Sequence, residues 1–144
     1  MFAYPTLKQP PHMEYKYKKA MVIDDNEIDL YVAEVVMKNT GFAAEVICVD
    51  SAKAALAYLK PLHANPEAIP DLIFLDINMP EMSGFDFLEE YQHLPDNIRR
   101  KCIIMMLTTS LDQADHVRAQ GNEFVHRFLN KPLDKGKLAD LSLL

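Results

Sequence analysis

The chain has 144 residues, of which 49% are hydrophobic and 25% are charged, and its formal net charge is −6 at pH 7. This composition is typical of one globular domain, and no apolar run approaches the roughly 20 residues that a membrane-spanning helix needs. The acidic balance argues against a nucleic-acid partner, because phosphate binding requires a basic face.

The N-terminal segment has no periodic hydrophobic pattern. Residues 1–17 contain several prolines, so we expect a flexible tail that precedes one domain over residues 18–144. The opening letters MFAYPTLKQPP lack the basic start and the apolar stretch of a secretory signal. We therefore expect a cytoplasmic protein that is not attached to a membrane.

Short apolar runs alternate with helical patterns from Lys19 onward. The letters KAMVI, residues 19–23, predict a strand, and residues 26–39 predict a helix that ends before Gly41. The residues that we expect on the inner face of this helix are Ile28, Val32, Val35 and Val36.

The same alternation continues through the middle of the chain. Residues 44–49 predict a second strand, and Asp50 or Ser51 is expected to cap the helix after it. The unbroken apolar run DLIFLDI, residues 71–77, predicts a strand buried on both faces, followed by another helix. The inner residues that we expect are Ala52, Ala55, Leu56 and Leu59 in the first helix and Phe85, Leu88 and Tyr91 in the second.

The last third of the chain repeats the pattern twice. Residues 102–107 predict a buried strand, and residues 108–110 are expected to cap a helix that Gly121 closes. Residues 124–129 predict a less apolar strand near an edge of the sheet, and residues 133–144 predict a short final helix. The inner residues that we expect in the helix before Gly121 are Leu111, Ala114 and Val117.

Five strands that alternate with helices predict an α/β fold with a parallel sheet. In such sheets, ligands bind beyond the carboxyl ends of the strands. The polar residues at those ends are Asp24 and Asp25 after the first strand, Asp76 at the third, Thr108 at the fourth and Lys131 at the fifth. We therefore expect these side chains to meet at one edge.

Three adjacent carboxylates need neutralising charge, which a divalent cation together with Lys131 would supply. Mg²⁺ is the expected ion, because it prefers oxygen ligands and is typically held by carboxylates and phosphate oxygens. A carboxylate beside such an ion can attack a phosphoryl group. We predict Asp76 as the nucleophile, Lys131 as its counter-charge and Thr108 as a donor to a phosphoryl oxygen.

Four motifs in this order resemble those of the receiver domains of two-component response regulators: VIDDNE, DLIFLDINMPEMSG, IIMMLTTS and FLNKP. The resemblance runs from about Lys19 to the C-terminus. It implies a flavodoxin-like, doubly wound sheet of five parallel strands in the order 2-1-3-4-5, with helices on both faces.

The resemblance also implies roles for individual residues. Asp76 matches the family's phosphoacceptor, and Asp24 and Asp25 match its acidic metal-binding pair, with Asp25 the expected direct ligand. Asn78 matches the position whose backbone carbonyl completes the metal site, and Lys131 matches the family's lysine. Mg²⁺ is the cofactor that this set implies.

Two further residues match the family's switch. Thr108 resembles the switch hydroxyl, which moves toward the phosphoryl oxygens, and Phe128 resembles the switch aromatic, which turns inward after it. Simple core packing is an equal alternative for Phe128. The change of surface that follows is expected to alter partner binding.

The implied function is that of a single-domain response regulator in a phosphorelay, signalling by protein contact. The expected phosphoryl donor is a sensor histidine kinase or a histidine phosphotransfer protein, and the downstream protein target is unknown. We expect a monomer or weak dimer that has no enzymatic activity beyond self-catalysed phosphotransfer and dephosphorylation.

Two other functional classes remain open from the residues. A haloacid-dehalogenase-like phosphatase also uses an aspartyl nucleophile with Mg²⁺, but it needs a second acid where Asn78 stands. A binding module with the receiver fold could signal without phosphorylation. The Asp24 and Asp25 pair alone would most often be a solvated turn or cap.

Overall fold

A parallel sheet with the strand order β2-β1-β3-β4-β5 forms the middle layer of the fold. The computed structural model describes residues 14–141. The strands are β1 (Tyr17–Ile23), β2 (Ala43–Val49), β3 (Leu72–Leu75), β4 (Ile103–Thr108) and β5 (Val125–Asn130). The predicted α/β class and the strand order 2-1-3-4-5 are confirmed. β5 lies at an edge of the sheet, as its weaker apolar character predicted.

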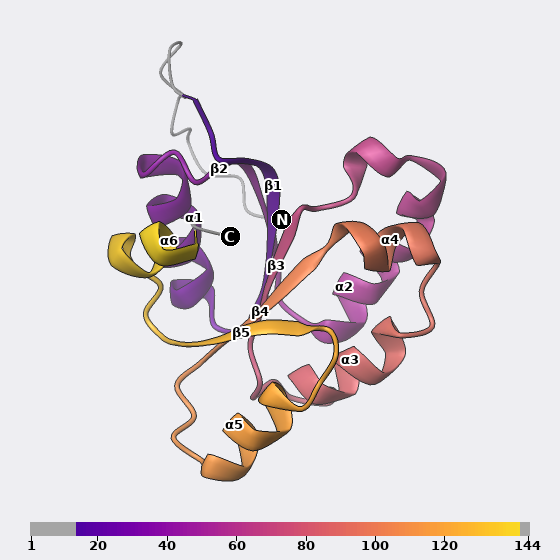
Figure 1. Cartoon of the computed structure of the whole chain (residues 1–144), viewed down its shortest axis with the longest axis vertical. Helices are drawn as coiled ribbons and strands as arrows, with labels where there is room; N and C mark the ends of the chain where they lie inside the picture. Colours follow the sequence, from indigo (N-terminus) through magenta and orange to yellow (C-terminus); the bar gives the residue numbers. More distant parts are fainter. Residues whose placement is uncertain (1–13, 142–144) are drawn as a thin grey trace.

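The helices cover both faces of the sheet (Figure 1). On one face lie α1 (Glu27–Asn39) and α6 (Lys135–Leu141), and on the other lie α2 (Ala52–Leu59), α3 (Gly84–Tyr91) and the short α4 (Asp96–Lys101). α5 (Gln113–Gln120) precedes β5, and two 3-10 helices, η1 (Lys60–Ala64) and η2 (Pro66–Ala68), occupy the proline-containing loop. In the part of the chain that the structure describes, no helix is long and apolar enough to cross a bilayer.

The first strand begins two residues earlier than predicted. The backbone N–H of Tyr17 donates to Phe42 O at 2.8 Å, and the two aromatic rings pack with centroids 5.2 Å apart. Tyr17 was included in the predicted tail, residues 1–17, of which residues 1–13 lie outside the described part of the chain.

The buried face of α1 differs from the prediction. Its buried residues are Leu30, Ala33, Glu34 and Met37, whereas Ile28 is 73% exposed. The three valines that were predicted to be buried, Val32, Val35 and Val36, are only partly buried. Apolar residues occur around most of this helix, so its hydrophobic pattern did not select a single face. Gly41 follows the helix with φ 73°, a left-handed conformation that glycine adopts without strain.

The predictions for α2 and α3 hold more closely. The side chain of Ser51 caps α2 by accepting from the backbone N–H of Ala54, and the inner residues Ala52, Ala55 and Leu59 are buried, with Leu56 partly buried. Ser83 and Asp86 form a capping box at the start of α3. The predicted inner residues of α3, Phe85, Leu88 and Tyr91, are all buried.

The prediction for α5 was wrong in its cap and its inner face. Asp112, and not residues 108–110, caps the helix by accepting from the backbone N–H of Ala114. Leu111 precedes the helix and is 89% exposed, Val117 is 58% exposed, and Ala119 is the buried residue of the helix. The hydrophobic spacing counted from Leu111 therefore began outside the helix and indicated the wrong face.

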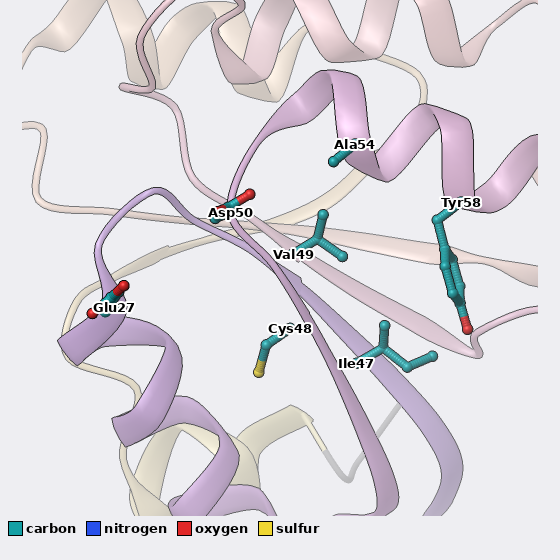
Figure 2. A pocket seen from close by; sticks show the side chains of 7 residues that line it. All are labelled: Glu27, Ile47, Cys48, Val49, Asp50, Ala54 and Tyr58. Carbon is teal, nitrogen blue, oxygen red and sulfur yellow. The ribbon is translucent and has the colours of Figure 1, made fainter. Parts of the chain in front are cut away.

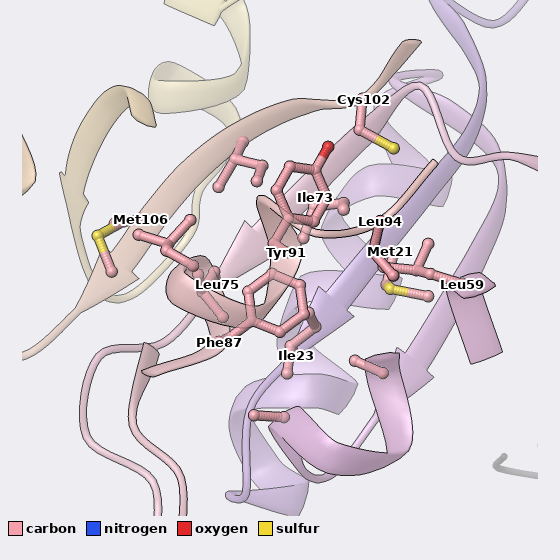
Figure 3. Packing of buried hydrophobic residues seen from close by; sticks show 14 of the residues in the cluster. Met21, Ile23, Leu59, Ile73, Leu75, Phe87, Tyr91, Leu94, Cys102 and Met106 are labelled. Carbon is pink, nitrogen blue, oxygen red and sulfur yellow. The ribbon is translucent and has the colours of Figure 1, made fainter. Parts of the chain in front are cut away.

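The core consists of one apolar cluster on each face of the sheet. Alternate residues of a strand point to opposite faces, so Met21 and Ile23 of β1 enter the cluster under α2 and α3, and Val22 enters the cluster under α1 and α6. Figure 3 shows Ile73 and Leu75 of β3 packed beside Met21 and Ile23 in the first cluster. Burying one such side chain fully stabilises the fold by about 1.5–3 kcal/mol. The two clusters hold the strand ends in fixed positions.

Candidate functional site

Two buried carboxylates stand side by side at the carboxyl ends of neighbouring strands. Asp24 follows β1 and Asp76 follows β3, and their exposed fractions are 2% and 6%. The backbone N–H of Asp24 donates to Val49 O at 3.1 Å, and that of Asp76 donates to Ile23 O at 3.0 Å. These bonds extend the sheet beyond the strand ends, so the backbone itself fixes the separation of the two acids.

Asp25 completes a cluster of three carboxylates. One carboxylate oxygen from each of Asp24, Asp25 and Asp76 lies within 4.8 Å of the others, and only Asp25 is exposed. Burial raises the pKa of Asp76 to about 6, and the negative charge of Asp24 adds to this effect. Burial also raises the pKa of Asp24, although hydrogen bonds from Lys131 and from the backbone N–H of Asn26 oppose it. The cluster therefore holds more negative charge than its surroundings favour.

Lys131 brings the compensating positive charge from the end of β5. Its Nζ lies 2.5 Å from Asp24 Oδ2 and 3.5 Å from Asp76 Oδ1, and its side chain is only 8% exposed. Its backbone N–H donates to Thr108 O at 2.9 Å, which anchors it to the end of β4. Burial alone would lower the pKa of Lys131, but hydrogen bonds with Asp24 and Asp29 outweigh that effect and raise the pKa to about 12. The lysine is therefore charged at neutral pH.

Asp29 is the residue that the sequence analysis missed. It lies in the first turn of α1, and its Oδ2 accepts from Lys131 Nζ at 2.8 Å. The prediction considered only the residues that follow strands, and Asp29 belongs to a helix. The sequence did contain a signal. Asn26 caps α1 just after the first strand, and Asp29 follows it by three residues, in the first turn of that helix.

Thr108 and Phe128 lie close to this edge. Thr108 is fully buried at the end of β4, and its Oγ1 accepts from the backbone N–H of Ser110 at 3.1 Å. Phe128 is partly buried in β5 and packs against the core and against His116, with ring centroids 4.1 Å apart. In the present conformation, Thr108 is thus hydrogen-bonded to the loop after β4, and Phe128 packs against α5.

Asn78 lies two residues after Asp76, in the loop that leads to α3, and is exposed. The loop returns to its own start, because the backbone N–H of Gly84 donates to Ile77 O at 2.8 Å. Glu81 in this loop has a φ of 67°, in the left-handed region. The tight loop keeps Asn78 near the strand end that carries Asp76.

The donor set suits a divalent cation of the Mg²⁺ type. Such an ion prefers oxygen ligands and is commonly held by one or two carboxylates together with water. Three carboxylate oxygens within 4.8 Å of one another meet this preference, and the raised pKa of Asp76 reflects an electrostatic cost that a cation would remove. The exposed side chain of Asp25 leaves the cluster open to solvent.

A cavity of about 330 Å³ lies beside the cluster, at the carboxyl half of β2. Figure 2 shows Glu27 of α1 on one side of it and Ala54 and Tyr58 of α2 on another. The three clustered carboxylates are not among the described residues that line it. The cavity is therefore a neighbour of the acidic site and not its entrance.

Comparison with known proteins assigns this arrangement to a family. Residues 20–142 match the response regulator receiver domain. The chain belongs to the receiver domain family. A solved two-component response regulator from Cytophaga hutchinsonii is similar at 27% sequence identity and a TM-score of 0.78, over 88% of this chain and 97% of that one.

Two other similar proteins are a histidine kinase and a second response regulator. Histidine kinase 2 of Arabidopsis thaliana is 43% identical over 84 residues, which are 58% of this chain and 6% of that kinase. This chain thus corresponds to a small part of the curated kinases that it resembles. The Mn²⁺-bound form of response regulator Rcp1 is 26% identical, with a TM-score of 0.65 over 87% of this chain and 88% of that one.

Family membership establishes the general role. Receiver domains are signalling domains of two-component systems, and histidine kinases phosphorylate them. The family typically binds Mg²⁺ at an acidic pocket. The three clustered carboxylates of this receiver domain lie at the edge of the sheet where its sequence predicted such a pocket.

Proposed function

We propose that this receiver domain accepts a phosphoryl group on Asp76 in a Mg²⁺-dependent reaction and then signals through protein contacts. One observation carries the proposal: Asp76 is buried between an acidic pair and the Nζ of Lys131. A carboxylate in that position combines a nucleophile with cationic groups that can stabilise the charge of a transferring phosphoryl group.

The expected donor is the phosphohistidine of a sensor histidine kinase or of a histidine phosphotransfer protein. A carboxylate oxygen of Asp76 attacks the phosphorus atom, a new P–O bond forms, and the P–N bond breaks with its electron pair going to the imidazole nitrogen. Lys131 stabilises the negative charge on the phosphoryl oxygens. The 43% identity to a histidine kinase supports this donor class.

The metal would be held by the carboxylates of Asp24, Asp25 and Asp76 and by the backbone carbonyl of Asn78. When bound, Mg²⁺ supplies positive charge that offsets the charge of the phosphoryl oxygens. Asp25 is the proposed direct ligand, because its side chain is exposed. Asp24 is the proposed outer ligand, because Lys131 already contacts its Oδ2.

Thr108 and Phe128 are the proposed switch. The Thr108 hydroxyl accepts from Ser110 in the present conformation and can donate to a phosphoryl oxygen after a small movement. That movement would vacate space near β4 and β5, into which the ring of Phe128 can turn from its contact with His116. The partner that reads this change is proposed to be a protein, and the domain itself a monomer or weak dimer.

Loss of the signal is proposed to be self-catalysed hydrolysis. A water oxygen attacks the phosphorus atom, the bond between phosphorus and the Asp76 oxygen breaks, and the products are inorganic phosphate and the original carboxylate. The phosphatase alternative is disfavoured by the family match and by the amide of Asn78 where a second acid would be needed. The phosphorylation-independent binding module is the alternative that an experiment must address.

The test is the mass of the intact protein after incubation with acetyl phosphate, with and without Mg²⁺. The variants are Asp76→Asn and, as a matched control, Asp140→Asn, which makes the same change at an exposed position in α6. We expect wild type and the control to gain one phosphoryl group only with Mg²⁺, and Asp76→Asn to gain none. A gain that persists in Asp76→Asn would refute the assignment, and no gain in any protein would favour the binding module.

A further inference from the structure

The ammonium group of Lys131 is shared among three carboxylates at unequal distances. Its Nζ lies 2.5 Å from Asp24 Oδ2, 2.8 Å from Asp29 Oδ2 and 3.5 Å from Asp76 Oδ1. N–H···O hydrogen bonds usually have lengths of about 2.7–3.2 Å, so the Asp24 contact is shorter than this range, the Asp29 contact lies within it and the Asp76 contact is longer. Lys131 is thus drawn away from the carboxylate that we propose as the phosphoacceptor.

Asp29 is held in place for this contact by the start of α1. The Asn26 side chain caps the helix by accepting from the backbone N–H groups of Ile28 and Asp29 at 2.9 and 3.1 Å. Asp29 therefore belongs to a fixed helical turn, whereas Lys131 reaches it with a long flexible side chain from beyond β5. The two residues are 102 positions apart in the sequence, and only the tertiary fold joins them.

We propose that Asp29 is a positioning residue that restrains Lys131 in the unphosphorylated state and so disfavours the phosphorylated one. This inference rests on the proposed role of Asp76. A phosphoryl group on Asp76 adds negative charge and new acceptor oxygens. For Lys131 to move closer to them, its hydrogen bond with Asp29 must lengthen or break. The Asp29 contact is therefore stronger before phosphorylation than after it.

The contact between Asp29 and Lys131 disfavours phosphorylation of Asp76 but favours Mg²⁺ binding. While Asp29 shares the lysine, less of the positive charge of Lys131 is directed at Asp76, which is the most distant of the three carboxylates. Without the Asp29 carboxylate, Lys131 would pair more fully with Asp76 and compete with Mg²⁺ for it. Asp29 thus favours the metal-bound, unphosphorylated form.

The test compares variants in the first turn of α1. Asp29→Asn removes the carboxylate that contacts Lys131, and Asp29→Glu retains a carboxylate at that position. Glu27→Gln is the matched control, because Glu27 is an exposed acid of the same helical turn and has no ion pair with Lys131 among the described residues. Both acids interact similarly with the helix dipole, so the comparison isolates the lysine contact.

Two affinities are measured by titration calorimetry on the full chain. The first is the affinity for Mg²⁺ alone, and the second is the affinity for fluoroberyllate, a phosphoryl mimic, at saturating Mg²⁺. For Asp29→Asn we expect fluoroberyllate to bind roughly two- to fivefold more tightly, the effect of one partly exposed ion pair, and Mg²⁺ to bind more weakly. We expect Asp29→Glu and Glu27→Gln to stay close to wild type. General damage to the fold would weaken both affinities, so the opposite shifts identify positioning.

Equal affinities in Asp29→Asn and wild type would overturn the inference, and so would equal shifts in Asp29→Asn and Glu27→Gln. Either result leaves the proposed phosphoacceptor intact, provided that wild type binds fluoroberyllate and Asp76→Asn does not. If wild type itself binds no fluoroberyllate and gains no phosphoryl group, the proposed function fails, and the restraint inferred from it fails with it.

Discussion

Replacing Gly84 with alanine tests how closely α3 must approach the strand that carries Asp76. Gly84 is the first residue of α3, and a Cβ atom there would lie 2.4 Å from the backbone oxygen of Asp76 and 3.0 Å from the Cα of Ile77. A third neighbour, Met106 Cε at 3.1 Å, is the flexible end of a side chain and can move. The oxygen of Asp76 is part of the backbone and cannot move alone.

The expected cost follows from these distances. Ordinary van der Waals contact begins at 3.4 Å, so the backbone near Asp76 or the start of α3 must shift by nearly 1 Å. Overpacking of this kind typically costs about 1–3 kcal/mol in the free energy of unfolding. In a chain of this size the melting temperature should fall by roughly 4–12 °C. The shift also displaces the carboxylate of Asp76, so Mg²⁺ should bind more weakly.

The assay is thermal unfolding of Gly84→Ala beside Gly121→Ala, with Mg²⁺ affinity measured on both. Gly121 is the matched control, because its nearest neighbour would be 3.5 Å from an added Cβ and its φ of −82° suits alanine. We expect Gly121→Ala to be neutral or stabilised by up to about 1 kcal/mol. Wild-type stability and Mg²⁺ affinity in Gly84→Ala would refute the argument from close approach.

Two further predictions concern the charge of the site and the packing of α1. Without metal, burial and the charge of Asp24 raise the pKa of Asp76 to about 6, so the folded state binds more protons than the unfolded state between about pH 4 and pH 6. In chelator, the stability of wild type relative to Asp76→Asn should therefore fall as the pH rises through this range, and chemical unfolding curves that show a constant difference would contradict the raised pKa. Ile28→Ser should change the free energy of unfolding by less than about 0.5 kcal/mol because Ile28 is 73% exposed, whereas Leu30→Ala should cost about 2–5 kcal/mol. A larger cost at Ile28 in the same unfolding assay would show that α1 buries the face predicted from its sequence.

The spacing of apolar residues along the chain was sufficient to predict an element where these residues formed a single continuous run or a single stripe. The apolar runs of β3 and β4 are short, which favours strands buried on both faces over helices, and Phe85, Leu88 and Tyr91 form one apolar stripe at helical spacing. It was insufficient where apolar residues were spread around a helix, as in α1, or where the start of a helix was misplaced, as in α5. In those elements the face that is buried depends on which part of the sheet the helix meets.

The sequence by itself determined the strand order, through the resemblance of its motifs to those of receiver domains. It also determined which residues meet at the carboxyl edge, because parallel strands bring their ends to one side of the sheet. Asp24, Asp76, Thr108 and Lys131 each follow or end a strand, so their positions could be read one at a time. The contact between Lys131 and Asp29 could not be read in this way. It depends on the rotation of α1 about its axis and on the reach of a side chain from a residue 102 positions away in the sequence, and only tertiary packing decides both.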